Sequence, residues 1–382
     1  MVWFKRRRRV LNLALQGGGA HGAFTWGVLD RLLDEDDLDI GWISATSAGA
    51  VNAVALAGGM ASGGREGARR ALAGIWQALV EAGVPDFIRL NPFLYGLSRS
   101  TPMSQMASLW SPYEFNPLGF DPLRRLLEDH IDFEKLKASA PVELLIAATQ
   151  VSTGQVRLFR RHEMTVEAVL ASACLPTLHH AVVIEGEAYW DGGFSANPDL
   201  VTLALESPFA DTLIVKLSPL TSDGVPTSVG EIAAHANRLT FNAPLLRDVK
   251  TITTARTALS RRWGRNANPL TALALARFHL IDAGRHTAGL RPETKVKPDA
   301  GLFTYLHGAG RTEAHKWLSR HKSDIGRRET VDLEARFLNP QIQPEPAAPP
   351  AAAPATPGMA DDLAALAPLA TDNPQRRSGS AD

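Results

Sequence analysis

The sequence predicts an α/β fold, a three-layer α/β/α sandwich in which helices cover both faces of a mostly parallel sheet. The segment 10–16 is apolar on both faces, as expected of a strand that is covered on both sides. Strand and helix patterns then alternate in the order strand, helix, strand, helix along residues 10–82. We therefore expect one α/β domain over residues 10–338.

The first helix is predicted over 22–36, where apolar residues recur at helical spacing and acids close the segment. A second strand follows at Ile40–Ala45. The segment 48–59 is rich in small residues and predicts a helix that packs close to the sheet, and another helix is expected at about 65–82. These elements supply the alternation on which the fold prediction depends.

The segment 84–120 has a different character, because prolines interrupt it while Phe, Leu, Tyr, Trp and Met recur. A long irregular segment inside a compact domain is usually functional or disordered, and this one is too apolar for disorder. We interpret it as a lid or wall over an apolar substrate site. A loop packed onto the core is the alternative.

The second half of the domain continues the pattern. A short helix at 121–131 precedes a strand at 142–151, and a turn connects that strand to 156–161, which predicts an edge hairpin. A helix over 165–176 ends at Pro176, and two short strands flank residues 185–187. A buried strand is expected at 212–217, followed by helices near 229–262, 267–284 and 303–321.

The two ends of the chain differ from the domain. Residues 1–9 form a basic arm, which either contacts an anionic membrane surface or is a solvated tail. Residues 339–382 are rich in Pro and Ala and predict a disordered tail. The start of the chain lacks the pattern of a signal peptide, and no window reaches the roughly 18 apolar residues of a membrane-spanning helix. We expect a cytoplasmic protein, either free or peripheral at the inner membrane surface.

Composition excludes several classes of function. The 382 residues contain 40 Lys plus Arg and 40 Asp plus Glu, so no overall charge attracts nucleic acid. The single cysteine, Cys174, excludes an internal disulfide and a cysteine-built zinc site. Its apolar surroundings are typical of a small buried residue rather than of a nucleophile. We expect no nucleic-acid partner, no metal and no organic cofactor.

A glycine-rich loop follows the first strand. Gly17, Gly19 and Gly22 satisfy G-x-G-x-x-G between a strand and a helix, the fingerprint of dinucleotide binding. In that fold an acid closes the second strand to bind the ribose, whereas here the strand is followed by Thr46 and Ser47. A nucleotide site is therefore the weaker interpretation of these glycines.

The same loop fits a serine hydrolase. Backbone N–H groups of a glycine loop at a helix N-terminus stabilise the oxyanion that forms when a nucleophile attacks an ester carbonyl. Ser47 supplies the nucleophile, at a position where a strand gives way to a helix. Its segment departs from the G-x-S-x-G elbow only because Ala45 replaces the first glycine, while Gly49 keeps the second.

A serine nucleophile needs a base within hydrogen-bond reach. No histidine occupies an evident triad position late in the chain. Asp191 instead ends a strand and is followed by Gly192 and Gly193, which let the backbone approach and the carboxylate point into a cleft. An aspartate that caps a glycine turn is the structural alternative.

Taken together, these segments resemble the patatin-like phospholipases, a family of lipid acyl hydrolases. The resemblance rests on four motifs in the family's order: GGGAHG at 17–22, ATSAG at 45–49, ASACLP at 171–176, and DGG at 191–193 followed by Asn197. It covers residues 10–220 and, less specifically, the helices to about 338. It implies an α/β/α fold and a two-residue catalytic dyad in place of a triad.

The resemblance also implies the roles of individual residues. Ser47 is expected to be the nucleophile and Asp191 its base, with Gly17, Gly18 and Gly19 as the oxyanion loop. Many family members carry Arg or Lys where this chain has His21. His21 therefore assists the oxyanion when protonated, packs structurally, or replaces Asp191 as general base.

We predict that the chain hydrolyses a carboxylic ester in a phospholipid or related lipid. Within the same class of enzyme, an intracellular polyester or an acyl-thioester would meet the same machinery. From another class, a non-catalytic lipid- or nucleotide-binding module with a vestigial elbow is the alternative.

Overall fold

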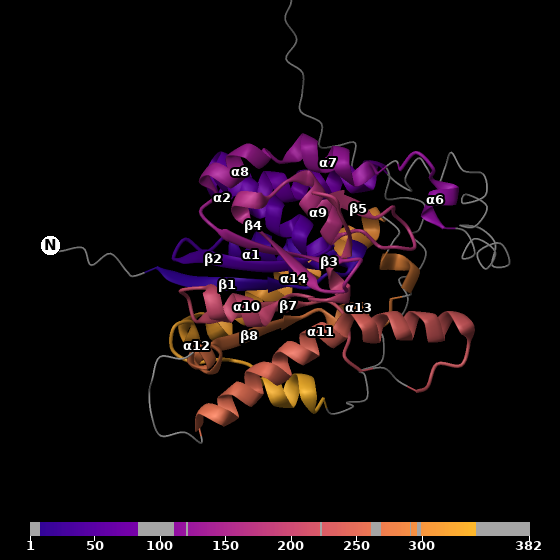
Figure 1. Ribbon diagram of the computed structural model, residues 1–382. Helices are drawn as coiled ribbons and strands as arrows, with labels where there is room; N and C mark the ends of the chain where they lie inside the picture. The colour runs from indigo at the N-terminus through magenta and orange to yellow at the C-terminus, as the bar shows by residue number, and fades with distance from the viewer. Residues whose placement is uncertain are drawn as a thin grey trace, which may run out of the picture. The chain divides into compact units, whose positions relative to one another are not determined.

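One mixed β-sheet forms the centre of the protein. The structure, a computed structural model, describes residues 8–82, 111–119, 121–221, 224–260, 269–290, 292–295 and 299–340. Within these residues the sheet has eight strands in the order β5-β6-β3-β2-β1-β7-β8, and β4 pairs with β3 outside this path (Figure 1). The predicted α/β class is therefore confirmed.

Five strands run parallel, and the apolar segments of the sequence predicted four of them, all except β8. They are β3 (Glu143–Gln150), β2 (Leu38–Thr46), β1 (Arg9–Leu15), β7 (Asp211–Lys216) and β8 (Arg277–Asp282). The other three are antiparallel to their neighbours: β4 (Val156–Arg160), β5 (Val182–Ile184) and β6 (Glu187–Asp191). The pairing of β3 with β4 is the predicted hairpin, and β5 and β6 are the predicted pair of short strands.

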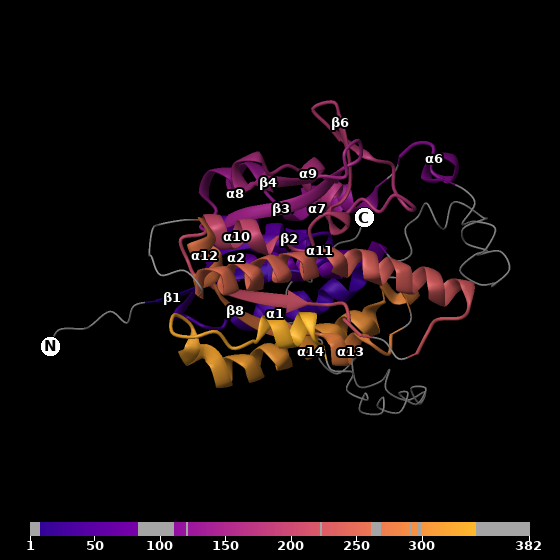
Figure 2. The same cartoon turned by 60° about the horizontal axis from the view of Figure 1, so that its bottom comes forward.

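Helices cover both faces of the sheet. One layer contains α1 (Gly22–Leu32), α2 (Ala48–Ala82), α9 (Val166–Ser172) and α14 (Ala300–His321), and α7 (Pro122–His130) and α8 (Phe133–Ser139) pack on α2. The other layer contains α10 (Leu200–Glu206), α11 (Val229–Ser260) and α12 (Pro269–Leu275). In Figure 1, α2 lies above β1 and β2 and this second layer lies below; Figure 2 shows α11 crossing in front.

The described residues also form several short helical segments. They are η1 (Gly19–His21), α6 (Pro112–Phe115), η2 (Arg161–Glu163), η3 (Gly192–Phe194), α13 (Gly284–Thr287), η4 (Pro292–Lys295), η5 (Lys322–Asp324) and η6 (Glu334–Leu338).

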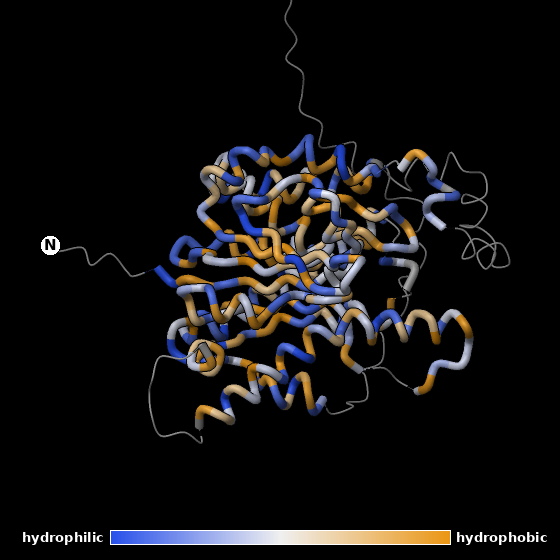
Figure 3. Tube along the Cα trace, viewed as in Figure 1, coloured by the Kyte–Doolittle hydropathy of each residue, from blue (hydrophilic) through white to orange (hydrophobic). Residues whose placement is uncertain are grey.

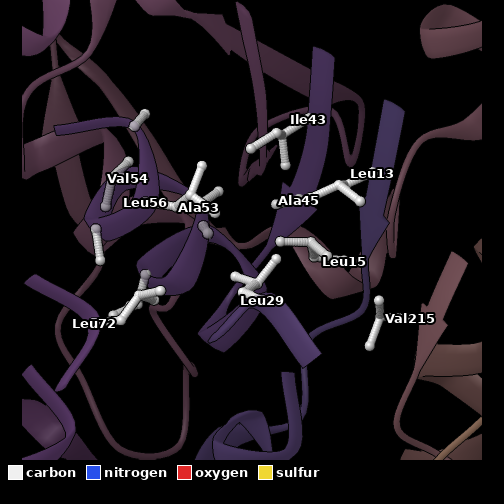
Figure 4. Close-up of a cluster of buried hydrophobic side chains, with 14 of the residues drawn as sticks. Leu13, Leu15, Leu29, Ile43, Ala45, Ala53, Val54, Leu56, Leu72 and Val215 are labelled. Atoms are coloured by element: carbon white, nitrogen blue, oxygen red, sulfur yellow. The ribbon is translucent and has the colours of Figure 1, made fainter. Parts of the chain in front are cut away.

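Strand β1 shows how the sequence divides the core. Leu11, Leu13 and Leu15 are fully buried in the cluster on the α1 and α2 side, whereas Ala14 belongs to the cluster on the α11 side. Because side chains alternate across a strand, one apolar segment thus serves both faces. Each fully buried leucine contributes about 1.5–3 kcal/mol. Figure 4 shows the larger cluster, and Figure 3 shows hydrophobic residues concentrated along the central strands.

Helix α2 contains both of the helices that the sequence predicts as separate elements. The backbone leaves helical geometry at Gly63 and Gly64, and Gly64 has a φ of 60°, which is the left-handed region that glycine adopts without strain. The predicted helices at 48–59 and 65–82 therefore lie on either side of this kink.

The prediction of one helix over 267–284 is wrong. Helix α12 ends at Leu275, and Arg277–Asp282 forms β8, which pairs residue by residue with β7. A short apolar run is ambiguous between helix and strand. This segment forms a strand because the edge of β7 needs hydrogen-bond partners for its backbone groups. Strand β8 supplies them.

Three predictions fall wholly or largely outside the described residues. Only Arg8 and Arg9 of the basic arm are described, and Arg9 already belongs to β1. Of the proposed lid, 84–120, the structure describes 111–119, and of the tail, 339–382, it describes two residues. None of the described helices combines the length and the hydrophobicity that crossing a membrane requires.

Candidate active site

Ser47 stands on the turn between β2 and α2. Its φ is 56°, an uncommon value for a residue with a side chain, so the backbone holds a strain of about 1–3 kcal/mol. Two hydrogen bonds hold the turn. The Ser47 N–H donates to Ser172 Oγ at 2.9 Å, and the Ser47 carbonyl accepts the Val51 N–H at 3.1 Å. The serine is therefore fixed by both of its own backbone groups.

Small residues let the segments of the site approach closely. A Cβ added to Gly49 would lie 2.4 Å from the Leu15 carbonyl oxygen, and one added to Gly17 would lie 2.8 Å from Ser47 Cβ. Both distances are too short for real side chains. Ala45 by contrast is buried inside β2, where it pairs with Leu15 and Ile146, so its methyl group lies before the turn.

The register of β3 brings Asp191 to the end of β2. Ala147 pairs with Thr46 and the next residue, Ala148, pairs with Asp191. Strand β4 pairs with one edge of β3 along the same residues. Strands β2 and β6 therefore share the opposite edge of β3, one after the other along its length. Consecutive positions on a strand are about 3.3 Å apart. Asp191 therefore pairs with β3 one position beyond Thr46, the residue that precedes Ser47.

Asp191 is fully buried and its backbone is fixed on both sides. Its N–H donates to the Cys174 carbonyl at 2.7 Å, and its carbonyl accepts the Thr149 hydroxyl at 2.8 Å. Its side-chain Oδ1 accepts the Gly193 N–H at 2.7 Å, which is the glycine-turn cap considered from the sequence. The close approach at Gly192 requires a glycine, since a Cβ there would lie 2.1 Å from the Ala147 oxygen.

The second carboxylate oxygen, Oδ2, faces a different environment. It is buried and has no partner in standard hydrogen-bond geometry among the described residues. The Ser47 hydroxyl is nevertheless near enough to lower the pKa of Asp191 by donating to the carboxyl. Burial outweighs this effect and raises the pKa to about 7. A carboxylate beside a serine with a pKa near neutrality is suited to accept its proton.

The glycine loop offers two unoccupied N–H groups rather than three. The Gly17 N–H donates to Asn197 Oδ1 at 2.8 Å. Among the described residues, no acceptor contacts the N–H of Gly18 or of Gly19. Gly19 has a φ of 57°, and a Cβ there would lie 2.2 Å from the Lys295 carbonyl oxygen. The loop is therefore anchored at Gly17 and open at the next two residues.

His21 belongs to the same loop and is buried. Its Nε2 is 2.8 Å from Thr294 Oγ1, and burial together with the charge of Lys295 lowers its pKa to about 4. The imidazole is therefore neutral near pH 7. No hydrogen bond joins any histidine of the described chain to Ser47.

Cys174, whose carbonyl contacts Asp191, is the other nucleophile that the sequence offered near the site. Cys174 is a free buried thiol whose pKa burial raises to about 12, which agrees with the small buried residue predicted. Across the described ranges, no three His, Cys, Asp or Glu side chains cluster as a metal site requires. The lack of a cofactor remains a prediction.

Sequence reasoning did not predict two of the residues that position the site. Ser172 lies in the ASACLP motif and receives the Ser47 N–H, and Asn197 follows the DGG turn and receives the Gly17 N–H. Both belong to motifs that the sequence had singled out. What was missing was the direction of each side chain, which depends on contacts over more than a hundred residues of chain.

Fold and site together define an α/β protein with a serine on a strand-to-helix turn and a buried carboxylate beside it. The family model described as "Patatin-like phospholipase" matches residues 13–204, which is 192 of the chain's 382 residues. The chain belongs to the patatin-like phospholipase family. Membership assigns it to the lipid acyl hydrolases in general.

Solved structures similar to the chain are distant from it. VipD from Legionella pneumophila is 14% identical, with 86% of this chain and 73% of VipD covered and a TM-score of 0.41. Full-length ExoU from Pseudomonas aeruginosa, in complex with SpcU, is 15% identical, with 87% and 77% covered and a TM-score of 0.26. A comparison with curated proteins found no sequence match. The family assignment therefore rests on the family model.

Proposed function

We propose that Ser47 and Asp191 form a catalytic dyad that hydrolyses a carboxylic ester of a phospholipid or related lipid. The observation that carries this proposal is the register of β3, which brings a buried carboxylate to the end of the strand that carries Ser47. The free Oδ2 and the pKa of about 7 support Asp191 as the base.

In the first half of the reaction, Ser47 Oγ attacks the ester carbonyl carbon and its proton passes to Asp191 Oδ2. The negative charge that develops on the carbonyl oxygen is stabilised by the N–H groups of Gly18 and Gly19. Such donors are each worth about 10²–10³ in rate. Collapse of the tetrahedral intermediate breaks the ester C–O bond, and Asp191 returns the proton to the leaving alcohol.

In the second half, water attacks the acyl group on Ser47 and gives its proton to Asp191. Collapse of this intermediate releases the carboxylic acid, and the proton returns to Ser47 Oγ. The strained backbone of Ser47 and its two hydrogen bonds keep Oγ in one place through both halves. The net reaction consumes one ester and one water and gives one alcohol and one carboxylic acid.

The alternative of a nucleotide-binding module has little support from the acids near β2. Asp39 pairs with Arg8 at 3.0 Å and Asp37 with Arg9 at 3.1 Å, at the beginning of β2. A ribose-binding acid has to lie at the other end of this strand. There Thr46 donates instead to the Ala196 carbonyl at 2.8 Å.

A fluorophosphonate probe tests the proposal on the intact protein. We expect one covalent adduct on the wild type and none on Ser47→Ala. Ser44→Ala is the matched control, because Ser44 is buried on the same strand and its Oγ has no hydrogen-bond partner among the described residues. Equal labelling of wild type and Ser47→Ala would disprove the assignment. Comparing the lipids, polyesters and acyl-thioesters of cells that carry wild type or Ser47→Ala then identifies the substrate.

A further inference from the structure

The segment that ends at Lys295 packs directly on the candidate oxyanion loop. The Lys295 carbonyl oxygen lies so close to Gly19 that a Cβ there would be 2.2 Å away. The neighbouring Thr294 hydroxyl is 2.8 Å from Nε2 of His21, in the same loop. Two contacts thus fix η4 against residues 19–21. The Lys295 ammonium is close enough to His21 to lower its pKa.

Arg238, on α11, is a second cation near Lys295. Phe241 lies about one helical turn after Arg238 and packs on Gly193. A Cβ added to Gly193 would lie 2.3 Å from the Phe241 ring. Asn242 bonds to Gln16 at 3.2 Å, so this face of α11 is turned toward the site. Arg238 precedes them by three and four residues and therefore lies on the same face. Its Nη2 is 2.9 Å from His235 Nδ1.

Among the described residues the two cations have no acidic partner. Neither Lys295 nor Arg238 forms an ion pair with Asp or Glu within the described part of the chain, in which 28 such pairs occur. Burial and, to a smaller extent, the charge of Arg238 lower the pKa of Lys295, and burial lowers the pKa of Arg238. Two partly buried like charges near each other are unfavourable, and an anion bound beside them would offset their repulsion.

We propose that Lys295 and Arg238 bind the phosphate of a glycerophospholipid whose ester carbonyl lies at Ser47. This inference rests on the proposed function and specifies its substrate class. A phosphodiester bears one delocalised negative charge, which Arg accepts through its planar fork and Lys as a point charge. In a glycerophospholipid the phosphate is a few bonds from the ester. The backbone of Lys295 lies against Gly19, so the Lys295 side chain starts beside the oxyanion loop.

The first test compares two lipids that have the same acyl chains, of which only one carries a phosphodiester headgroup. Dioctanoyl-phosphatidylglycerol and dioctanoylglycerol are offered in the same detergent micelles to the full chain. We expect Lys295→Gln and Arg238→Gln each to lower the ratio of kcat/KM for the phospholipid to that for the diacylglycerol about tenfold, the usual size of one charged hydrogen bond. Because a misfolded variant loses both activities, the ratio isolates phosphate recognition.

The matched control is Lys250→Gln, which removes an exposed positive charge from the same helix three turns away. It is expected to keep the wild-type ratio. A ratio unchanged in Lys295→Gln and Arg238→Gln would overturn the proposal. So would an equal loss on both lipids in soluble, folded variants, since that result assigns the cations to the oxyanion. A loss of ratio in Lys250→Gln as well would attribute the preference to overall charge and also overturn it.

A binding measurement separates this proposal from the proposed function. Ser47→Ala cannot turn over an ester by the dyad, so calorimetric titration with dihexanoyl-phosphatidylglycerol reports recognition alone. We expect binding to weaken about tenfold on adding Lys295→Gln, even if the wild type proves inactive on every ester and unlabelled by the probe. Unchanged binding would contradict the proposal. Glycerol 3-phosphate that binds as tightly as the phospholipid would show a site for free phosphate esters and would also contradict it.

Discussion

The side-chain oxygen of Asn197 accepts the N–H of Gly17 at 2.8 Å and so ties the glycine loop to the segment that follows Asp191. Asn197 also donates from Nδ2 to the Phe241 carbonyl at 2.9 Å. One buried side chain thereby connects the oxyanion loop, the base and α11. The parts of the proposed site are consequently held as one unit, although they lie 180 residues apart in sequence.

Removing the Asn197 amide is expected to loosen the loop. Asn197→Ala leaves the Gly17 N–H buried without its acceptor, which costs about 1–3 kcal/mol of folding free energy. We expect kcat on a soluble ester to fall at least about tenfold, because Gly18 and Gly19 then lose their fixed position. Asn197→Asp keeps the acceptor for Gly17 and should retain more activity than the alanine variant. Equal losses in the two would contradict an anchoring role.

The elbow leaves no space for a methyl group at Gly49. In Gly49→Ala the new Cβ would lie 2.4 Å from the Leu15 carbonyl oxygen, so β1 and α2 have to separate. We expect a loss of about 1–3 kcal/mol in the free energy of unfolding, measured with urea. Gly230→Ala is the control, because it lies in α11 with nothing within 4 Å of the added Cβ. It should be neutral or stabilising by about 0.4–1 kcal/mol.

Much of the fold could be predicted because its signals are local. The apolar segments of β1 and β7 and the helical spacing of α1 and α14 each lie within one stretch of sequence. The strand β8 was mistaken for part of a helix, since its six residues become a strand only by pairing with β7. Pairing partners are a property of the whole chain, and local periodicity does not contain them.

Some residues of the candidate site could likewise be predicted from the sequence, and others could not. Ser47 and Asp191 could be named because Ser47 directly follows β2 and Asp191 ends β6, each within a recognisable motif. The residues that hold them in position could not be named from the sequence. Ser172 and Asn197 act through single hydrogen bonds to Ser47 and Gly17, and both bonds depend on the packing of α9 and of the segment after β6. The sequence also predicted Gly17 as an oxyanion donor, whereas its N–H is occupied by Asn197. Gly18 and Gly19 remain as the proposed donors.

His21 is expected to support the loop without taking part in proton transfer. Its pKa of about 4 makes it neutral at pH 7, and its Nε2 is engaged with Thr294. We predict that His21→Ala lowers kcat less than tenfold, whereas Asp191→Asn lowers it at least about 10³-fold. His21→Gln, which can still bond to Thr294, should be nearer to wild type. Loss of turnover in His21→Ala with survival in Asp191→Asn would make His21 the base and disprove the dyad.

The pKa of Asp191 predicts opposite effects of pH on activity and on stability. Because the base has to be ionised, kcat/KM for a soluble ester should rise with pH and level off above about 7. Folding, by contrast, binds a proton at Asp191 between its unfolded pKa of about 4 and its folded pKa of about 7. The unfolded state holds fewer protons in this window, so the contribution of Asp191 to stability falls as pH rises, by on the order of 2–4 kcal/mol.

Asp191→Asn removes this titration and allows both effects to be measured on one variant. At pH 8 we expect the variant to be inactive yet more resistant to urea than the wild type, because an uncharged amide replaces a buried carboxylate. At pH 4, where Asp191 is protonated in the folded state, the two proteins should have similar free energies of unfolding. If Asp191→Asn were destabilised equally at both pH values, the carboxylate would be ionised and paired in the folded protein, and its assignment as a base with a raised pKa would be wrong.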